Sequence, residues 1–361
     1  MHFNFSNVND AFVILVRRFS ESGKQDPLFS TRESRVGSVV EITEPVIITY
    51  EHPTIRTLLF KQRDANPFFH VYEAMWMLAG RNDLASLKQF VSTFDNFSDD
   101  GVTLNGAYGY RWRHAILNNN SPFEEERDQL EILIEHLKSN PNSRRAVLQM
   151  WNVEDDLLKV DSSKDVCCNL SVVFSIRKES QSEGDIAENG EDPGSLDMTV
   201  FNRSNDLIWG CLGANYVHFT FLQEYMASKL GVNVGRYHQV TTNLHVYTER
   251  FQPEKWLSND SLFNMPNLHA KNKQAVPLIS EPAYFDSELH DFVNTRLKDW
   301  RPEHLSGYKN LFFRDVAIPM LLTLQGHKEK NIAVAKHWAR LIKDDMWRTA
   351  VQDWLDLRWC K

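Results

Sequence analysis

The segments CCNLSVVFSIR (167–177) and LDMTVFNRSND (196–206) decide the fold class of this chain. Both are rich in β-branched and aromatic residues and are bounded by turn-forming residues, a pattern that predicts strands. RRAVLQMWNV (144–153) before them and VGRYHQVTTNLHVYTER (234–250) after them predict further strands. Residues 178–195 lack apolar periodicity and are predicted to form an exposed loop. The central third of the chain is therefore strand-rich.

Helices are predicted on both sides of this region. Residues 66–92 read as a buried helix, a Gly-Arg-Asn turn and a second helix, and residues 122–139 place apolar side chains at helical spacing behind an acidic first turn. Residues 213–231 form a strongly apolar segment that ends at a glycine, as helices often do. Two short segments within residues 27–60 are rich in β-branched residues and predict strands.

Composition limits the class of protein. The chain has 361 residues, 42% apolar and 24% charged, which suffices for a well-buried core. No linker or repeat divides it, so we expect one domain over residues 1–361 with a mostly helical region at 251–361. No apolar window is long enough to span a membrane, and the N-terminus lacks an export signal, so a cytoplasmic protein is expected. A net charge of −8 argues against direct nucleic-acid binding.

The cysteines point away from disulfides and metals. Cys167, Cys168, Cys211 and Cys360 include no CxxC pair, and the thirteen histidines show no metal-binding spacing, so no metal is expected. Cys167 and Cys168 open a predicted strand, so their side chains lie on opposite faces and at most one can face a given site. A buried structural cysteine is the more common case. A nucleophilic cysteine needs nearby cations or hydrogen-bond donors to form its thiolate.

Arginines supply candidate cations. SRR (143–145) and NRSND (202–206) each place arginine beside a serine, and Arg35 lies in the turn SRVGS. Guanidinium groups bind phosphate in a bidentate manner and a serine hydroxyl adds a donor. The same residues would equally serve as surface arginines or ion-pair partners, so this pattern alone leaves both interpretations open.

Seven motifs in order resemble a known family. They are Glu73 in YEAMWMLAG, YGYRWR (108–113), SRRAVLQMWN (143–152), CNLSVVF from Cys168, NRSND (202–206), Asn215 and LHVY (244–247). Together they resemble the thymidylate synthase family over roughly residues 30–250. The resemblance implies an α+β fold with a six-stranded mixed sheet and packed helices. It also implies a homodimer whose sheets pack back to back and whose active sites borrow arginines across the interface.

The resemblance also implies the catalytic groups. Cys168 matches the nucleophile better than Cys167, because Phe174 then occupies the position of a family phenylalanine. Glu73 matches the glutamate that organises water and protons near the base, and Tyr108 the tyrosine implicated in removing the C5 proton. Asp206 matches an aspartate whose backbone contacts the pyrimidine, and we place it in both the catalytic and the folate-binding sets.

The resemblance also implies which residues bind the nucleotide and the folate. The resemblance assigns the 5′-phosphate of a pyrimidine deoxynucleotide to Arg35, Arg203 and Ser204, with Arg144 and Arg145 supplied across the dimer interface. Asn215 matches the reader of the N3 and O4 edge, and His245 and Tyr247 match contacts of the deoxyribose 3′-hydroxyl. The co-substrate is expected to be 5,10-methylenetetrahydrofolate, lined by Phe94, Phe97 and Asp206.

Departures from the synthase pattern indicate a different last step. Phe94 and Phe97 replace two tryptophans, Asn169 replaces the histidine after the nucleophile, and WGCLGAN (209–215) is one residue longer. The chain also runs about a hundred residues past LHVY instead of ending in a short apolar tail that keeps water out. We therefore expect dUMP hydroxymethylation with water. The alternatives are thymidylate synthesis, then dCMP or CMP hydroxymethylation, then a non-catalytic nucleotide-binding relative.

Overall fold

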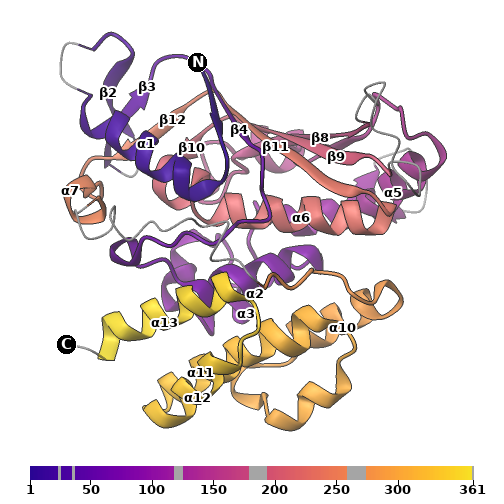
Figure 1. The fold of residues 1–361 in the computed structure, drawn as a ribbon. Coiled ribbons are helices and arrows are strands. Elements are labelled where there is room, and N and C mark those ends of the chain that lie inside the picture. The colour runs from indigo at the N-terminus through magenta and orange to yellow at the C-terminus, as the bar shows by residue number, and fades with distance from the viewer. Residues whose placement is uncertain (23–25, 35–36, 118–124, 179–192, 258–273, 360–361) are drawn as a thin grey trace, which may run out of the picture.

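The predicted strands form a six-stranded mixed sheet in the computed structural model, which describes residues 1–22, 26–34, 37–117, 125–178, 193–257 and 274–359 (Figure 1). The strand order is β1 (His2–Phe5), β4 (Val46–Tyr50), β11 (Asn233–Thr241), β9 (Ser195–Asn202), β8 (Asn169–Arg177) and β7 (Val147–Gln149). The β1–β4 and β9–β11 pairs are parallel and the other neighbours are antiparallel. The expected α+β fold with a six-stranded mixed sheet is confirmed.

Two smaller sheets complete the strand content of the described residues. One has the order β10 (Asn205–Asp206), β12 (Leu244–Tyr247), β3 (Gly37–Ile42) and β2 (Phe29–Ser34), and the other pairs β5 (Ala115–Leu117) with β6 (Glu125–Arg127). The parallel bridge between β10 and β12 places Asp206 opposite His245. Two short strands thus join segments separated by about forty residues and carry side chains of the predicted nucleotide site.

One helix is shorter than predicted. The helix expected over 122–139 begins only at Gln129, as α5 (Gln129–Ser139). The Asp128 side chain accepts hydrogen bonds from the backbone N–H groups of Leu130 and Glu131, which fixes the start of the helix there. The preceding residues 125–127 form β6 instead. Most of the expected loop at 178–195 lies outside the described residues.

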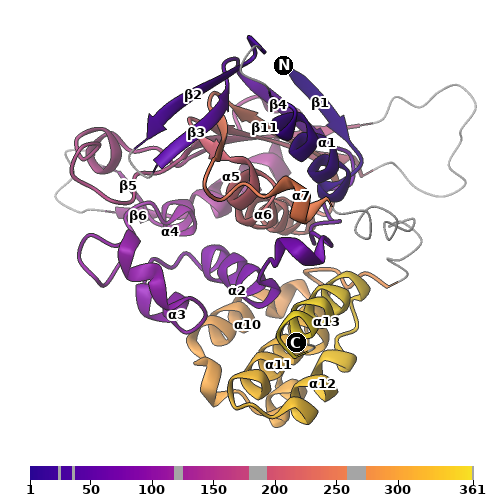
Figure 2. The ribbon, with the colours of Figure 1, turned by 90° about the vertical axis from the view of Figure 1, so that its left-hand side faces the viewer.

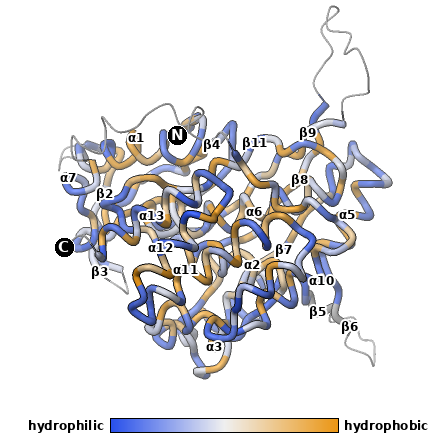
Figure 3. Tube along the Cα trace, turned by 60° about the horizontal axis from the view of Figure 1, so that its bottom comes forward, coloured by the Kyte–Doolittle hydropathy of each residue, from blue (hydrophilic) through white to orange (hydrophobic). Residues whose placement is uncertain are grey.

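Two apolar helices are stacked beneath the large sheet: α6 (Ala214–Leu230) contacts β9 and β11, and α2 (Pro67–Leu78) packs on α6. In α2 eleven of the twelve residues are buried, and α6 is buried on most of its circumference. The Asn66 side chain caps the start of α2, and α6 ends at Gly231 with the left-handed φ of 72°. Hydrophobic stretches follow these helices and the strands above them (Figure 3). Helices apolar on all sides belong between two layers, and both are covered from below.

The covering layer comes from the C-terminal part of the chain. We define the C-terminal layer as α10 (Pro282–Asn294), α11 (Ile318–Lys328), α12 (Ile332–Leu341) and α13 (Asp345–Trp359), together with the turns that connect them. It packs against α2 on the side away from the sheet (Figures 1 and 2). Buried residues of the layer and of the sheet region belong to one continuous hydrophobic cluster. None of the described helices is long and apolar enough to cross a bilayer.

The remaining helical elements, most of them short, lie between the strands and helices named above. They are α1 (Val8–Ser20), η1 (Lys61–Arg63), α3 (Leu84–Lys88), η2 (Ser92–Phe97), α4 (Tyr108–Arg113), η3 (Val153–Leu157), η4 (Leu207–Cys211), α7 (Pro253–Trp256), η5 (Leu297–Asp299), η6 (Pro302–Gly307) and η7 (Phe313–Ala317). Of these, α4 and η4 contribute most to the site, because they flank the ends of α2 and α6.

Candidate active site

The two adjacent cysteines occupy different environments. Cys167 is 1% exposed, and its thiol donates to the backbone oxygen of Asn169 at 2.9 Å. Burial raises the pKa of Cys167 to about 12, which keeps its thiol protonated. Cys168 is half-buried, and its sulfur lies 3.7 Å from Nη2 of Arg203. Of the two, Cys168 has both the access and the cation that a thiolate nucleophile needs.

Arg203 is held firmly beside this sulfur. Its Nε donates to the Cys167 oxygen and its Nη2 to the Val166 oxygen, each at 2.9 Å. Its backbone N–H donates to the Cys168 oxygen at 3.0 Å, and its guanidinium lies 5.9 Å from the Trp151 ring centre. The positive charge is therefore positioned by the same turn that presents the thiol.

A buried ion pair anchors that turn. The carboxylate of Asp156 is fully buried, pairs with Arg111 of α4, and accepts a hydrogen bond from the Cys167 backbone N–H at 3.0 Å. It also accepts from the Asn152 N–H at 2.9 Å. Because Arg111 and Tyr108 lie on the same short helix, the ion pair fixes the position of the cysteines relative to Tyr108.

Tyr108 and Glu73 meet where α4 crosses α2. Gly109 allows this approach, because a Cβ there would lie 2.0 Å from the Met77 carbonyl oxygen. Burial raises the pKa of Tyr108 well above its usual value, and the nearby Cys168 and Glu73 raise it further. Glu73 is buried on α2, and its Oε2 lies 2.9 Å from Nε2 of His218 on α6. Tyr108, Glu73 and Cys168 thus form one cluster, with His218 behind it.

A second cluster lies at the β10–β12 bridge. Asp206 caps η4 by accepting hydrogen bonds from the N–H groups of Ile208 at 2.9 Å and Trp209 at 2.5 Å. Burial raises the pKa of Asp206 and lowers the pKa of His245, while each group's charge opposes the shift of the other. The His245 ring shares a 2.9 Å hydrogen bond with Asn243 Oδ1, which also accepts from the Ser204 hydroxyl at 3.4 Å.

A family model described as thymidylate synthase matches residues 24–302, more than half of the chain. The chain belongs to the thymidylate synthase family. A protein of Pseudomonas phage M6 named deoxyuridylate hydroxymethyltransferase is 38% identical over 91% of this chain and 87% of its own length. A protein of the same name from Bacillus phage SP01 is 38% identical over 75% of this chain and 67% of its own. A third, from Delftia phage PhiW-14, is 28% identical over 54% of this chain and 50% of its own.

Other residues matched to thymidylate synthase motifs lie apart from these clusters. Arg144 and Arg145 are exposed at the start of β7, an edge strand, and form no ion pair within the described chain. Phe94 packs on Phe69 at 5.3 Å between ring centres, whereas Phe97 is 54% exposed. Arg35 lies outside the described residues.

Tyr247 and Asn215, the other two residues matched to family motifs, lie close to the second cluster. Tyr247 stands edge-on to His245, with 5.2 Å between ring centres. Asn215 occupies the first turn of α6, where its Nδ2 donates to Asn205 Oδ1 at 3.1 Å.

Two residues that the sequence motifs did not single out also reach the site. Arg63 is buried, and this burial lowers the pKa of its guanidinium to about 10 although the nearby Asp206 opposes the shift. It lies 4.0 Å from the Trp209 ring centre and donates to the Ile208 oxygen at 3.2 Å. His218 is the other, as the neighbour of Glu73. Arg63 and His218 do not lie in a recognisable motif. The sequence around each predicts only a structural role in the packed core.

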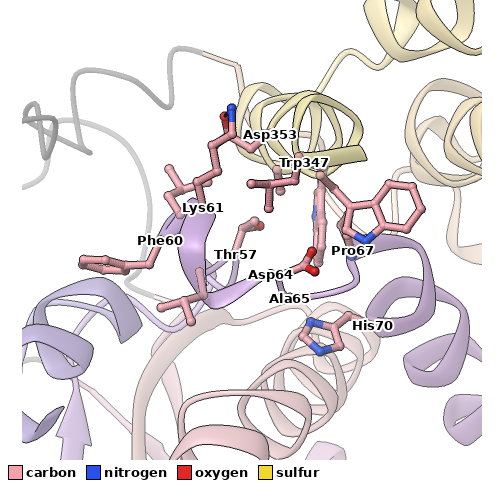
Figure 4. A pocket seen from close by; sticks show the side chains of 14 residues that line it. Thr57, Phe60, Lys61, Asp64, Ala65, Pro67, His70, Trp347 and Asp353 are labelled. Carbon is pink, nitrogen blue, oxygen red and sulfur yellow. Dashed lines mark ion pairs between the residues drawn. The ribbon is translucent and has the colours of Figure 1, made fainter. Parts of the chain in front are cut away.

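A small cavity lies at the contact between the sheet region and the C-terminal layer. It measures about 30 Å³, room for about one water molecule, between the segment 57–70 and α13. Figure 4 shows His70 on one side of it and Trp347 and Asp353 on the other. His70 precedes Glu73 by one turn of α2, so α13 packs close behind the helix that carries the candidate catalytic glutamate.

Proposed function

We propose that this chain transfers a one-carbon unit from 5,10-methylenetetrahydrofolate to C5 of dUMP and leaves it as a hydroxymethyl group. Members of the thymidylate synthase family act on a pyrimidine nucleotide with this folate. The shared name of the three phage relatives supports water rather than hydride as the final acceptor. The observation that carries the chemistry is the contrast between the half-buried Cys168 beside Arg203 and the buried, protonated Cys167.

The first step assigned to the chain is addition of the Cys168 thiolate to C6 of the pyrimidine. The sulfur forms a bond to C6, and the C5–C6 electron pair moves toward C4 and O4, which makes C5 nucleophilic. Arg203 stabilises the thiolate before the attack. C5 then bonds to the methylene carbon of the folate. Loss of the C5 proton, assigned to the neighbourhood of Tyr108, breaks the bond between that carbon and the folate nitrogen, which releases tetrahydrofolate and leaves an exocyclic methylene at C5. The raised pKa of Tyr108 keeps its phenol protonated, so it takes part in this proton transfer through a hydrogen bond and not as a phenolate.

The second step is capture of water by the exocyclic methylene at C5. Water oxygen bonds to that carbon, its proton passes to the Glu73 carboxylate, and the C5–C6 double bond reforms as the Cys168 sulfur leaves C6. Glu73 is the buried carboxylate of the cluster, and its contact with His218 gives the proton a second acceptor. Phe94, Phe97 and Asp206 are assigned to the folate side.

Nucleotide binding is assigned to the clusters around Arg203 and His245. Arg203 and Ser204, with Arg35, would hold the 5′-phosphate, and His245 with Tyr247 would contact the 3′-hydroxyl. The hydrogen bond between the His245 ring and Asn243 fixes the ring's orientation, and this preorganisation supports the assignment. Asn215 would read the N3 and O4 edge of the base.

The active unit is proposed to be a homodimer of single-domain chains. The strand alternation leaves one face of the large sheet partly exposed, including Ile47 and Val147, at 38% and 45%. Arg144 and Arg145 extend from the edge of this sheet without an ion-pair partner within the described chain. A second copy packed on this face would cover the apolar side chains and could take these arginines to its phosphate site.

Product analysis tests the proposed reaction. The protein is incubated with methylenetetrahydrofolate and either dUMP or dCMP, and both the nucleotide and the folate products are identified by mass. Hydroxymethyl-dUMP with tetrahydrofolate is the expected result. A methylated base with dihydrofolate would establish thymidylate synthesis instead, and turnover of dCMP alone would establish the cytidylate activity. Nucleotide binding without turnover would establish a non-catalytic relative.

Subunit mixing tests the shared site. Cys168→Ser and Arg145→Ala proteins, each inactive alone, should regain part of the activity when their subunits exchange, because hybrid dimers contain one intact site. Exchange without recovered activity would contradict the arginine assignment and leave the reaction assignment unaffected.

A further inference from the structure

Three side-chain amides, of which two are buried and Asn215 is half-buried, form a series of hydrogen bonds behind the predicted base site. Asn215 Nδ2 donates to Asn205 Oδ1 at 3.1 Å, and Asn205 Nδ2 donates to Gln239 Oε1 at 3.5 Å. Gln239 Nε2 then donates to the backbone oxygen of Cys211 at 3.0 Å. Asn205 and Gln239 are 3% and 0% exposed, so no bulk water competes for these bonds.

The hydrogen bond from Gln239 to the Cys211 backbone oxygen fixes the donor-to-acceptor direction of the whole series. An amide can turn over and exchange its donor and acceptor ends, but a backbone carbonyl oxygen can only accept. Gln239 must therefore direct its nitrogen toward Cys211 and its oxygen toward Asn205. Asn205 must then direct its own oxygen toward Asn215. The orientation of Asn215 follows from a backbone group two side chains away.

We propose that Asn205 and Gln239 are specificity-determining positioning residues that hold the Asn215 amide in the orientation that reads uracil. The proposal rests on the proposed function, in which Asn215 faces the pyrimidine edge. In this orientation Asn215 keeps one N–H to donate to the uracil O4 and its oxygen to accept from N3–H. In this role Asn205 and Gln239, which are 3% and 0% exposed, act through Asn215 and not by contact with the nucleotide.

Cytosine would require the opposite orientation. Its N3 accepts and its 4-amino group donates, so Asn215 would have to turn over and present its oxygen to Asn205 Oδ1. Asn205 and Gln239 would have to follow, which would bring Gln239 Oε1 against the Cys211 oxygen, at the site of the present 3.0 Å contact. Two acceptors would then meet in a buried position, an arrangement that costs a lost hydrogen bond and adds repulsion.

The surrounding backbone prevents the amides from moving aside. A Cβ at Gly210 would lie 2.2 Å from Asn205 Oδ1 and 3.1 Å from Asn215 Nδ2. The η4 backbone therefore packs directly on the Asn205–Asn215 hydrogen bond, and only glycine leaves room for it.

Equilibrium binding of dUMP and dCMP to the full-length protein without folate tests the proposal. The wild type should favour dUMP by about ten- to a hundredfold, the range of one or two directed polar contacts. Asn205→Ala and Gln239→Leu should each lower this ratio by about tenfold, because Asn215 can then turn over. Asn205→Asp should keep the ratio, because one carboxyl oxygen still accepts from Asn215 Nδ2 and, in this buried position, the protonated second oxygen donates to Gln239 Oε1 as Asn205 Nδ2 does.

Gln223→Ala provides the matched control. Gln223 is a fully buried amide on α6 that donates to the Leu196, Gly235 and Arg236 oxygens, remote from the base site. Its loss should lower the midpoint of thermal unfolding without altering the dUMP to dCMP ratio. This control separates loss of a buried amide from loss of orientation.

The outcomes separate this proposal from the proposed function. An unchanged ratio in Asn205→Ala or in Gln239→Leu, provided the variant is folded, overturns the positioning role, as does a wild type that binds both nucleotides equally. If one variant does not fold, the other decides. A thymidylate product in the mass assay would overturn the water step but not the positioning role, because binding is measured without folate.

Discussion

Buried carboxylates of the C-terminal layer and the buried Glu73 of the sheet region are satisfied in different ways, although ring nitrogens of Trp300, His327 and Trp354 in the layer also lack a hydrogen bond among the residues that the structure describes. In the layer, the Glu288 carboxylate accepts from the backbone N–H groups of Lys309 at 2.5 Å and Asn310 at 3.0 Å. Asp344, where the layer joins the core, accepts from Met346 and Trp347, each at 3.0 Å. The backbone of the layer itself satisfies these carboxylates, so they hold the local fold together.

In the sheet region, several buried polar atoms have no well-directed hydrogen bond within the described chain. They include Oε2 of Glu73, both ring nitrogens of His218 and the side-chain amide of Asn169, which follows Cys168. Buried polar atoms are nearly always satisfied in folded proteins, so such a group marks a place where water or a ligand completes the contacts. We therefore expect substitution of Glu73, His218 or Asn169 to alter turnover first. We expect substitution of a carboxylate that the local backbone satisfies, such as Glu288 or Asp344, to alter stability first.

The adjacent cysteines give the largest expected effect. Cys168→Ser should lower turnover by several orders of magnitude, as loss of a covalent nucleophile does, while Cys167→Ser retains much of the activity. The measurement is tritium release from C5 of labelled dUMP, with thermal unfolding of each variant to exclude global damage. A dead Cys167→Ser protein beside an active Cys168→Ser protein would reverse the assignment.

The next largest effect concerns the ion pair beneath the cysteines. Asp156→Ala leaves Arg111 buried without its partner and frees the Cys167 N–H, so the free energy of unfolding should fall by about 3–5 kcal/mol. Asp155→Ala is the matched control, because its pair with Lys159 is exposed and should contribute at most about 1 kcal/mol. Denaturant titration measures both. Similar losses in the two variants would show that Asp156 does not anchor the turn.

The sequence could predict the parts of this molecule that depend on local pattern. Strands such as β8 and β9 follow from β-branched composition, and α2 follows from an apolar run behind the cap at Asn66. The choice of Cys168 over Cys167 also rested on strand position, and their different burial agrees with it. Motif order was enough to name the family.

Other features depend on contacts between distant segments, which no local pattern encodes. His218 lies on an apolar helix and meets Glu73 only because α2 and α6 pack together. Gln239 and Asn205 lie 34 residues apart, so their hydrogen bond becomes visible only when β10 and β11 are placed in space. The late start of α5 depended on the Asp128 cap, which outweighed the acidic residues before it.

At the junction of the two regions we expect a pH-dependent contribution to stability that is smaller, per pH unit, than the loss expected for Asp156→Ala. Desolvation of the half-buried His70 ring, then the nearby His218 and Arg63, lowers the pKa of His70 to about 3, against about 6.5 in an unfolded chain. Between these values the unfolded chain binds a proton that the folded chain does not. Stability should therefore fall as pH drops from 6.5 toward 3, by up to about 1.4 kcal/mol per pH unit.

His70→Gln should remove this contribution, so its stability should decline less steeply over that window than that of the wild type. His290→Gln, at an exposed histidine on α10, is the control and should follow the wild-type curve. Free energies of unfolding at several pH values give the comparison. Parallel curves for wild type and His70→Gln would mean that His70 is protonated in the folded protein.

The smallest expected effect tests whether charge or packing joins α13 to the sheet region. Arg358 pairs with Asp64 at 2.8 Å, but their side chains are 30% and 45% exposed, so the coupling free energy should be at most about 1 kcal/mol and should weaken in salt. A double-mutant cycle with Asp64→Asn and Arg358→Ala measures it. Asparagine is the suitable replacement because residue 64 has a left-handed φ of 53°.

Arg358→Ala should lower the free energy of unfolding more than Asp64→Asn does, since the guanidinium also lies 3.5 Å from the Trp354 ring centre. A coupling well above 1 kcal/mol would mean that surface charge holds this helix in place, whereas a small one leaves that role to the buried aromatic contacts of Trp354 and Phe68, whose ring centres are 5.1 Å apart.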